Sequence, residues 1–169
     1  WPVLRIAQDC IIDLPNYDLS LPTRRGLRRK LRKAEKSGVT VIRANRLPIS
    51  QMAAVDADWR RAHGPALGGT MGRFCPKYLQ NQTVYLAYCE TRLIAIASFH
   101  TDTASHCLDL MRHAGDMPDG TMHLIVQSAL ADAQRMGKGE LSLAALPNFP
   151  NWVRHIGVLR HKTENPGLR

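Results

Sequence analysis

The sequence lacks any apolar run long enough to cross a bilayer, which takes about 18–20 consecutive apolar residues. Its longest strongly apolar stretch, Leu93 to Phe99, has the length of a strand. The four cysteines, at positions 10, 75, 89 and 107, show no CxxC spacing. The absence of CxxC spacing argues against a zinc ribbon and a disulfide scaffold, and it suits a protein of the reducing cytoplasm. No signal peptide is visible.

A metal-binding pattern is also missing. Four of the seven histidines, His100, His106, His113 and His123, lie near one another in the sequence, but no two of them have HxxxH spacing. No set of acidic ligands accompanies them. We therefore expect no metal. We interpret Cys107, on an apolar strand, as a small core side chain rather than a nucleophile.

What the chain does contain is enough apolar sequence for one folded domain. It has 169 residues, of which 44% are hydrophobic, close to the average of globular proteins. We expect residues 1–169 to form a single domain. The first residue is not Met, and the last residues, Gly167-Leu168-Arg169, close no element, so we expect a segment of a longer protein.

The positive charge is concentrated in one segment. The formal net charge is +9, and residues 24–36 hold eight basic side chains against the single acid Glu35, a net charge of +7. A helix over about residues 23–37 leaves only a narrow apolar stripe, and almost every other direction is basic. Arginine outnumbers lysine there, which favours forked contacts to phosphate on RNA or on an anionic lipid surface. A solvated face is the alternative. The candidate tRNA- or phosphate-binding residues are Arg24, Arg25, Arg28, Arg29, Arg32 and Lys33.

The remaining segments alternate between strands and helices. Strands are expected at 3–13, 39–44, 83–89, 92–99, 105–112 and 140–145, and further helices at 49–63, 121–136 and 152–156. Three strands joined by short turns, then a helix and another strand, predict an α+β fold. Its mixed sheet is mostly antiparallel, with helices on both faces. This order suits Gcn5-related N-acetyltransferases, in which the strands before and after the last helix splay apart and the acyl donor binds between them.

Two segments near the expected splay carry candidate site residues. Asp109 and Arg112 lie near the end of a buried strand. On a regular strand they point to opposite faces, and they share a face only if the strand is bulged. Asp119, Gly120 and Thr121 open the next helix, whose free N–H groups form an anion or substrate site. For both segments a purely structural role is the alternative.

The loop before that helix lacks the pattern that binds coenzyme A. Acetyl-CoA users of this fold carry Gln/Arg-x-x-Gly-x-Gly/Ala at this place, and residues 113–118, HAGDMP, do not supply it. Asp116 and Asp119 also repel a pyrophosphate. Coenzyme A is therefore disfavoured, and no cofactor is expected.

Several segments together resemble a known family. They are Asp13-Leu14-Pro15 with Leu19; Arg25 and Leu27-Arg28 through Ala34-Glu35 to Gly38; Met71-Gly72-Arg73-Phe74 with Tyr78-Leu79; Leu93-Ile94-Ala95 to Ser98; and Asp109-Leu110-Met111-Arg112 followed by Pro118-Asp119-Gly120-Thr121-Met122. Their order and spacing over most of residues 9–145 resemble the C-terminal catalytic domain of phosphatidylglycerol lysyltransferases and alanyltransferases, the multiple peptide resistance factor group.

The resemblance implies transfer of an aminoacyl group from aminoacyl-tRNA to a lipid hydroxyl, usually that of phosphatidylglycerol. It also implies two acyltransferase-like halves in the complete family domain, with this chain mostly the second half. Asp109 and Arg112 match the family's catalytic pair, and Glu35 matches an active-site acid on the basic helix near the tRNA acceptor end. Such an enzyme is expected in the cytoplasm, peripheral at the inner face of the membrane, with aminoacyl-tRNA and anionic phospholipid as partners.

The chain departs from the family at two positions, Asp119, where the family usually has Asn, and His123, where it usually has Asp. The final tripeptide Gly167-Leu168-Arg169 resembles the start of a basic aromatic segment that supplies a functional Lys in relatives. Two other functions stay open: an acyl-CoA-dependent N-acyltransferase, and a non-catalytic RNA- or membrane-binding module. The sequence does not identify the amino acid, the acceptor lipid or the oligomeric state.

Overall fold

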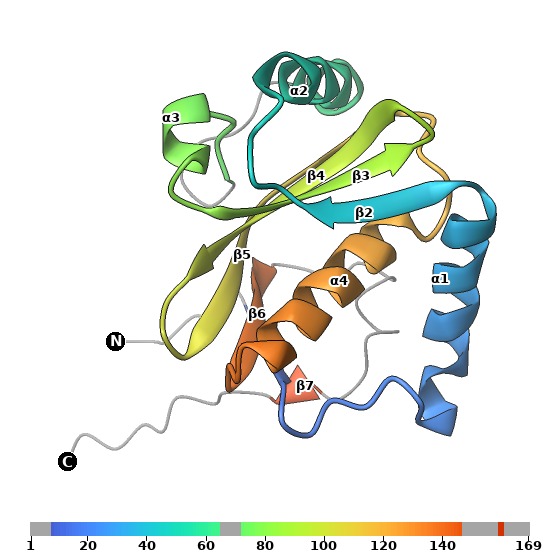
Figure 1. Cartoon of the computed structure of the whole chain (residues 1–169), viewed down its shortest axis with the longest axis vertical. Helices are drawn as coiled ribbons and strands as arrows, with labels where there is room; N and C mark the ends of the chain where they lie inside the picture. Colours follow the sequence, from blue (N-terminus) through green and yellow to red (C-terminus); the bar gives the residue numbers. More distant parts are fainter. Residues whose placement is uncertain (1–7, 65–71, 147–158, 161–169) are drawn as a thin grey trace, which may run out of the picture.

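A mixed sheet of seven strands forms the centre of the part of the chain that the structure describes, and helices cover both of its faces (Figure 1). The structure is a computed structural model, and it describes residues 8–64, 72–146 and 159–160. The strands are β1 (Gln8–Asp13), β2 (Val39–Arg43), β3 (Thr83–Cys89), β4 (Arg92–Thr101), β5 (Ser105–His113), β6 (Glu140–Leu146) and β7 (Leu159–Arg160). The helices are the 3-10 turn η1 (Pro22–Arg24) and α1 (Arg25–Lys36), α2 (Ile49–His63), α3 (Pro76–Leu79) and α4 (Thr121–Arg135).

The strand order is β2-β3-β4-β5-β6-β1-β7. Neighbouring strands are antiparallel except β5 and β6, which are parallel. Two short turns make a meander of β3, β4 and β5, and α4 then carries the chain back so that β6 starts beside the start of β5. The predicted α+β class, with a mostly antiparallel mixed sheet and helices on both faces, is confirmed.

Most predicted elements appear within two residues of their expected ends. Two short elements were not predicted, α3 and β7, because four and two residues are too few to produce a periodic pattern. The helix expected at 152–156 lies outside the described residues, as do residues 3–7 of the first expected strand.

The sheet separates two apolar cores. The larger core lies between the sheet and α4 with α1, and the smaller lies between the sheet and α2 with α3. Leu108 belongs to the larger core and Leu110 to the smaller one. Residues two apart on a regular strand share a face, so β5 is irregular between these two leucines.

The helix α1 packs by the narrow stripe that its sequence pattern predicts. Its buried residues are Leu27, Leu31 and Ala34. The start of the helix differs from the expectation, because the turn η1 precedes it and Arg24, rather than Thr23, is the N-cap. At the other end Gly38 follows the C-cap with φ of +78°, a conformation that glycine adopts without strain.

The helices α1 and α4 meet at Gly120, where the two backbones touch. Gly120 has φ of +94°, and a Cβ atom there would overlap the carbonyl oxygen of Lys30. Beside it, the carboxylate of Asp119 lies 3.5 Å from Nζ of Lys30 and 3.2 Å from Nζ of Lys33. The hydrogen bond from Lys33 lowers the pKa of Asp119. The basic helix is thus tied to the start of α4.

We predict that Gly120→Ala lowers the free energy of unfolding by about 2–4 kcal/mol, because it adds both a strained φ and a backbone overlap. Urea denaturation measures the loss. The matched control is Gly115→Ala in the same loop, where a Cβ meets no atom within 4 Å. Equal losses from the two variants would contradict the close contact between α1 and α4.

Candidate active site

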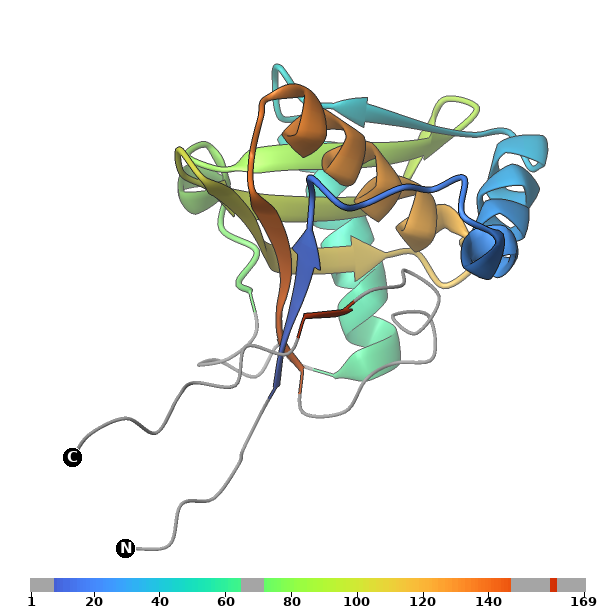
Figure 2. The same cartoon turned by 90° about the horizontal axis from the view of Figure 1, so that it is seen from below.

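Strands β5 and β6 separate soon after they start. They pair at three positions, from Ser105 with Glu140 to Cys107 with Ser142. Beyond these positions, among the described strands, β5 pairs with β4 and β6 pairs with β1. In Figure 2, β5 runs to the right whereas β6 runs down the view beside β1. The splay expected from the order of elements is therefore present, and it begins after Cys107 and Ser142.

Strand β5 is bulged at Asp109. Ser98 of β4 pairs with Leu110 and the next residue, Phe99, pairs with Leu108, so Asp109 is an extra residue on β5. The extra residue reverses the alternation of side chains along the strand. As a result, Asp109 contacts Gln82, which lies between α3 and β3, and Arg112 contacts Asp56 of α2 on the same face of the sheet. The condition under which the two side chains share a face is met.

Asp109 is partly exposed on this face, with 17% of its side chain accessible. Its Oδ2 accepts a hydrogen bond from Nε2 of Gln82 at 2.9 Å, and its Oδ1 lies 3.7 Å from Nε2 of His100. The hydroxyl of Tyr78 lies 2.8 Å from the same histidine nitrogen. Desolvation, and then the charge of Asp109, raise the pKa of Tyr78. A carboxylate, an amide, an imidazole and a phenol thus gather at the bulge.

Arg112 is buried, and protein groups surround its guanidinium. Its side chain is 2% exposed, and Nε donates to Oδ1 of Asp56 at 2.9 Å. The terminal nitrogens donate to the carbonyl of Met111 at 2.7 Å and to that of Gly72 at 3.0 Å. The ring of Trp59 lies 3.9 Å from the guanidinium carbon. Arg112 therefore joins α2, β5 and the segment at Gly72 through one charged group.

Gly72 approaches β5 more closely than any other residue type could. A Cβ atom on Gly72 would overlap the carbonyl oxygen of Asp109 and lie 2.8 Å from Cα of Leu110. The carbonyl of Gly72 meanwhile accepts the hydrogen bond from Arg112. The segment that starts at Gly72 is therefore fixed directly against the bulge.

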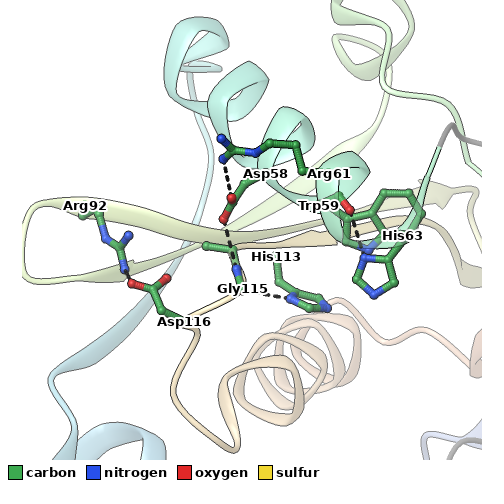
Figure 3. A network of polar contacts seen from close by, with 9 residues as sticks. Asp58, Trp59, Arg61, His63, Arg92, His113, Gly115 and Asp116 are labelled. Atoms are coloured by element: carbon green, nitrogen blue, oxygen red, sulfur yellow. Dashed lines mark hydrogen bonds and ion pairs between the residues drawn. The ribbon is translucent and has the colours of Figure 1, made fainter.

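A polar network holds the end of α2 against the loop between β5 and α4 (Figure 3). Oδ2 of Asp58 accepts a hydrogen bond from the backbone N–H of Gly115 at 3.0 Å, and Oδ1 pairs with Arg61 at 2.5 Å. The bond from Gly115 and then that from Arg61 lower the pKa of Asp58. In the same loop Asp116 pairs with Arg92 at 2.6 Å. The network supports the part of α2 that contacts Arg112.

The point where β5 and β6 part is also polar. Oγ of Ser142 donates to Oδ1 of Asp9 at 2.7 Å and accepts from the backbone N–H of Ala144 at 2.9 Å. Cys107 lies opposite Ser142, and burial raises the pKa of its thiol. A raised pKa disfavours the thiolate, which is the form that a nucleophilic cysteine needs.

The basic helix divides into engaged and exposed residues. Arg24 is 2% exposed, lies 4.1 Å over the ring of Tyr17 and donates to the carbonyl of Asp18, so it is unavailable to a phosphate. Arg28 donates to two carbonyls of the preceding loop, at 2.6 and 2.7 Å. Lys33 pairs with an acid at the start of α4. The candidate phosphate ligands that are exposed and free of ion pairs within the described residues are Arg25, Arg29 and Arg32.

The other candidate site residues lie apart from Asp109 and Arg112. Glu35 is exposed on α1, and α1 packs with α4 on the opposite face of the sheet. Thr121 is buried, and its hydroxyl donates to a carbonyl within its own turn at 2.7 Å. The structure thus brings Asp109 and Arg112 together but not Glu35 or the start of α4. The functional roles of all these residues stay predictions.

Comparison with known sequences decides the family. The family of phosphatidylglycerol lysyltransferase C-terminal domains matches residues 1–161. The chain belongs to this family. One relative is the lysylphosphatidylglycerol biosynthesis bifunctional protein LysX of Mycolicibacterium vanbaalenii, which is 29% identical over 150 residues. The LysX protein of Mycobacterium avium is 27% identical over 150 residues. Each match covers 83% of this chain and 13% of the relative, so the chain spans only a small part of the length of these relatives.

Solved structures share the fold. The C-terminal domain of a protein assigned as a lysylphosphatidylglycerol synthetase in Agrobacterium fabrum has a TM-score of 0.78 at 21% identity, over 85% of this chain and 48% of that one. L-PGS from Bacillus licheniformis has a TM-score of 0.75 at 19% identity, over 88% of this chain and 47% of that one. None of the helices that the structure describes is both long and apolar enough to cross a membrane.

Sequence reasoning missed the residues that hold the candidate pair in place. In the sequence, Asp56 and Trp59 fall within the helix expected at 49–63, and nothing marks Gln82. The available signal was an acid on the apolar face of α2, since Asp56 is 4% exposed beside the buried Met52 and Val55. An acid on such a face needs a buried cation, but the sequence does not say which one.

We predict that Asp56→Ala lowers the free energy of unfolding by about 3–5 kcal/mol, because it leaves the guanidinium of Arg112 buried without its counter-ion. Asp58→Ala is the matched control, since Asp58 lies on the same helix and pairs with an exposed arginine. We expect a much smaller loss from the control. Chemical denaturation of both variants makes the comparison, and similar losses would contradict the anchoring role of Asp56.

Proposed function

We propose that this protein transfers an aminoacyl group, lysyl as in the named relatives, from aminoacyl-tRNA to the hydroxyl of phosphatidylglycerol. The observation that carries the proposal is the family match over residues 1–161. The relatives are named for lysylphosphatidylglycerol biosynthesis. The proposed location is the inner face of the membrane, as a peripheral protein.

The proposed reaction requires no activation of the acyl donor by the protein. An aminoacyl ester is already activated, so its transfer to another hydroxyl requires alignment, proton transfer and stabilisation of the developing oxyanion. The accessible carboxylate of Asp109, at the place where β5 and β6 part, supports its proposed role in binding the acceptor hydroxyl or the ammonium group of the amino acid. The engaged guanidinium of Arg112 supports a role in fixing the bulge that carries Asp109.

The start of α4 favours a tRNA donor over coenzyme A. A coenzyme A pyrophosphate would bind at this helix start in the acetyltransferase fold. Here the carbonyl of Lys30 packs against Gly120, and the carboxylate of Asp119 lies beside it. The backbone of α1 therefore occupies the space in front of this helix start, and the carboxylate of Asp119 is already paired with Lys30 and Lys33. The exposed arginines of α1 support the polyanionic donor instead.

We predict that the full-length protein forms lysyl-phosphatidylglycerol from lysyl-tRNA and phosphatidylglycerol vesicles, detected by mass spectrometry of the lipids. Asp109→Asn is expected to lower the transfer rate by at least about 100-fold, because it removes the charge but keeps the shape of the side chain. Glu90→Gln, an exposed acid in the turn before β4, is the control with unchanged activity.

Other products point to the alternative functions. An acetylated amine formed from acetyl-CoA would replace the proposal with an N-acyltransferase. Binding of tRNA without turnover of any aminoacyl-tRNA would replace it with a non-catalytic module. Full transfer by the Asp109→Asn variant would support the proposed function but show that Asp109 has no role in the reaction.

We also predict that the triple variant Arg25→Ala, Arg29→Ala and Arg32→Ala binds tRNA more weakly and with a smaller salt dependence. Each lost phosphate contact lowers the slope of log K against log salt by about 0.7–0.9. Binding titrations from low to moderate salt measure the slope. Arg43→Ala, an exposed arginine on β2, is the control with an unchanged slope. An unchanged slope in the triple variant would show that the tRNA does not bind to this face of α1.

A further inference from the structure

His100 occupies an unusual place beside the bulge. It lies near the end of β4, directly opposite Cys107 of β5, and Cys107 is itself opposite Ser142 of β6. The three residues form a row across the sheet at the position where β5 and β6 part. The side chain of His100 is 52% exposed, so a substrate on this face can approach it.

The polar contacts of His100 with other described residues all involve one ring nitrogen. Its Nε2 lies 2.8 Å from the hydroxyl of Tyr78, 3.1 Å from Nε2 of Gln82 and 3.7 Å from Oδ1 of Asp109. The amide nitrogen of Gln82 also donates to Asp109 at 2.9 Å, which fixes it as a donor. Because the amide nitrogen of Gln82 can only donate, we assign Nε2 of His100 as the acceptor, and Nδ1 then carries the proton of the neutral ring.

This arrangement gives Tyr78 a proton acceptor. With this tautomer the O–H of Tyr78 donates to Nε2 of His100, and 40% of Tyr78 is exposed, so a substrate can reach this side chain. If the imidazole takes the phenol proton, the carboxylate of Asp109 lies 3.7 Å from the new positive charge and stabilises it. Among the described residues, Cys107 pairs opposite His100, and burial raises the pKa of its thiol so that it stays neutral.

We propose that Tyr78 and His100 form the proton relay of the transfer reaction, with Asp109 as the counter-ion; this inference rests on the proposed function. The acceptor hydroxyl gives its proton to the oxygen of Tyr78 while Tyr78 gives its own proton to Nε2 of His100. The hydroxyl oxygen forms a bond to the ester carbonyl carbon. The bond from that carbon to the ribose oxygen then breaks, and the ribose oxygen takes a proton back from Tyr78, which regains one from His100.

Geometry favours the imidazole over the carboxylate as the store for this proton. Nε2 of His100 lies 2.8 Å from the hydroxyl of Tyr78, whereas Asp109 accepts from Gln82 and lies 3.7 Å from the same histidine nitrogen. Tyr78 is thus the catalytic residue that touches the acceptor, whereas His100 acts through Tyr78.

The test compares Tyr78→Phe, His100→Gln and the control Gln80→Ala, an exposed residue at the end of α3, in the full-length protein. Transfer from lysyl-tRNA to phosphatidylglycerol vesicles is measured in single turnovers between about pH 5.5 and 8.5. The wild-type protein is expected to lose rate towards the acid end of this range, because a protonated imidazole cannot accept a proton. Both relay variants are expected to lose at least about 100-fold in rate and to lose this acid limb.

A second variant separates the relay from a structural role. His100→Ala removes the ring, and added imidazole is expected to restore part of the rate with its own pH dependence, which a packing role would not do. A wild-type protein that transfers lysine, together with His100→Gln and Tyr78→Phe variants that keep its rate and its acid limb, would overturn the relay and leave the proposed function intact. A wild-type protein that transfers no aminoacyl group would overturn both.

Discussion

The buried pair of Arg112 and Asp56 is the interaction on which the arrangement of the candidate site depends. A guanidinium removed from water is costly unless a counter-ion and hydrogen-bond acceptors surround it. Arg112 meets this requirement with one carboxylate from α2 and two carbonyls, at Met111 and Gly72. The same requirement therefore brings a helix, a strand and a loop segment to one point.

The bulge in β5 places the carboxylate of Asp109 on the same face as the buried Arg112. Without the extra residue, Asp109 would point to the face of α4 while Arg112 pointed to the face of α2. With it, the carboxylate reaches Gln82 and His100 on the same face as Arg112. Gly72 closes against the bulge, so any side chain at that position would push the two segments apart. The geometry around Asp109 is thus set by a strand irregularity, a glycine and a buried charge.

The sequence predicts the framework better than the site. The periodic apolar residues of β3, β4, β5 and α4 predict those elements, and their order predicts where β5 and β6 part. The bulge at Asp109 has no sequence signal, since neither Gly nor Pro marks it. The partners of Arg112 at Gly72 and Asp56 stand 40 and 56 residues earlier in the chain, and only tertiary contact brings them together. Likewise, a uniform run of basic residues does not reveal that Arg24 is buried over an aromatic ring.

We propose that the aminoacyl group reacts on the face of Asp109, where β5 and β6 part. The most direct test is an experimental structure of the full-length protein with a non-hydrolysable 3′-aminoacyl-adenosine analogue bound. We expect the acyl carbonyl to lie beside Asp109 and Tyr78, on the face covered by α2 and α3. An acyl carbonyl bound at the start of α4, beside Gly120 on the opposite face, would contradict it.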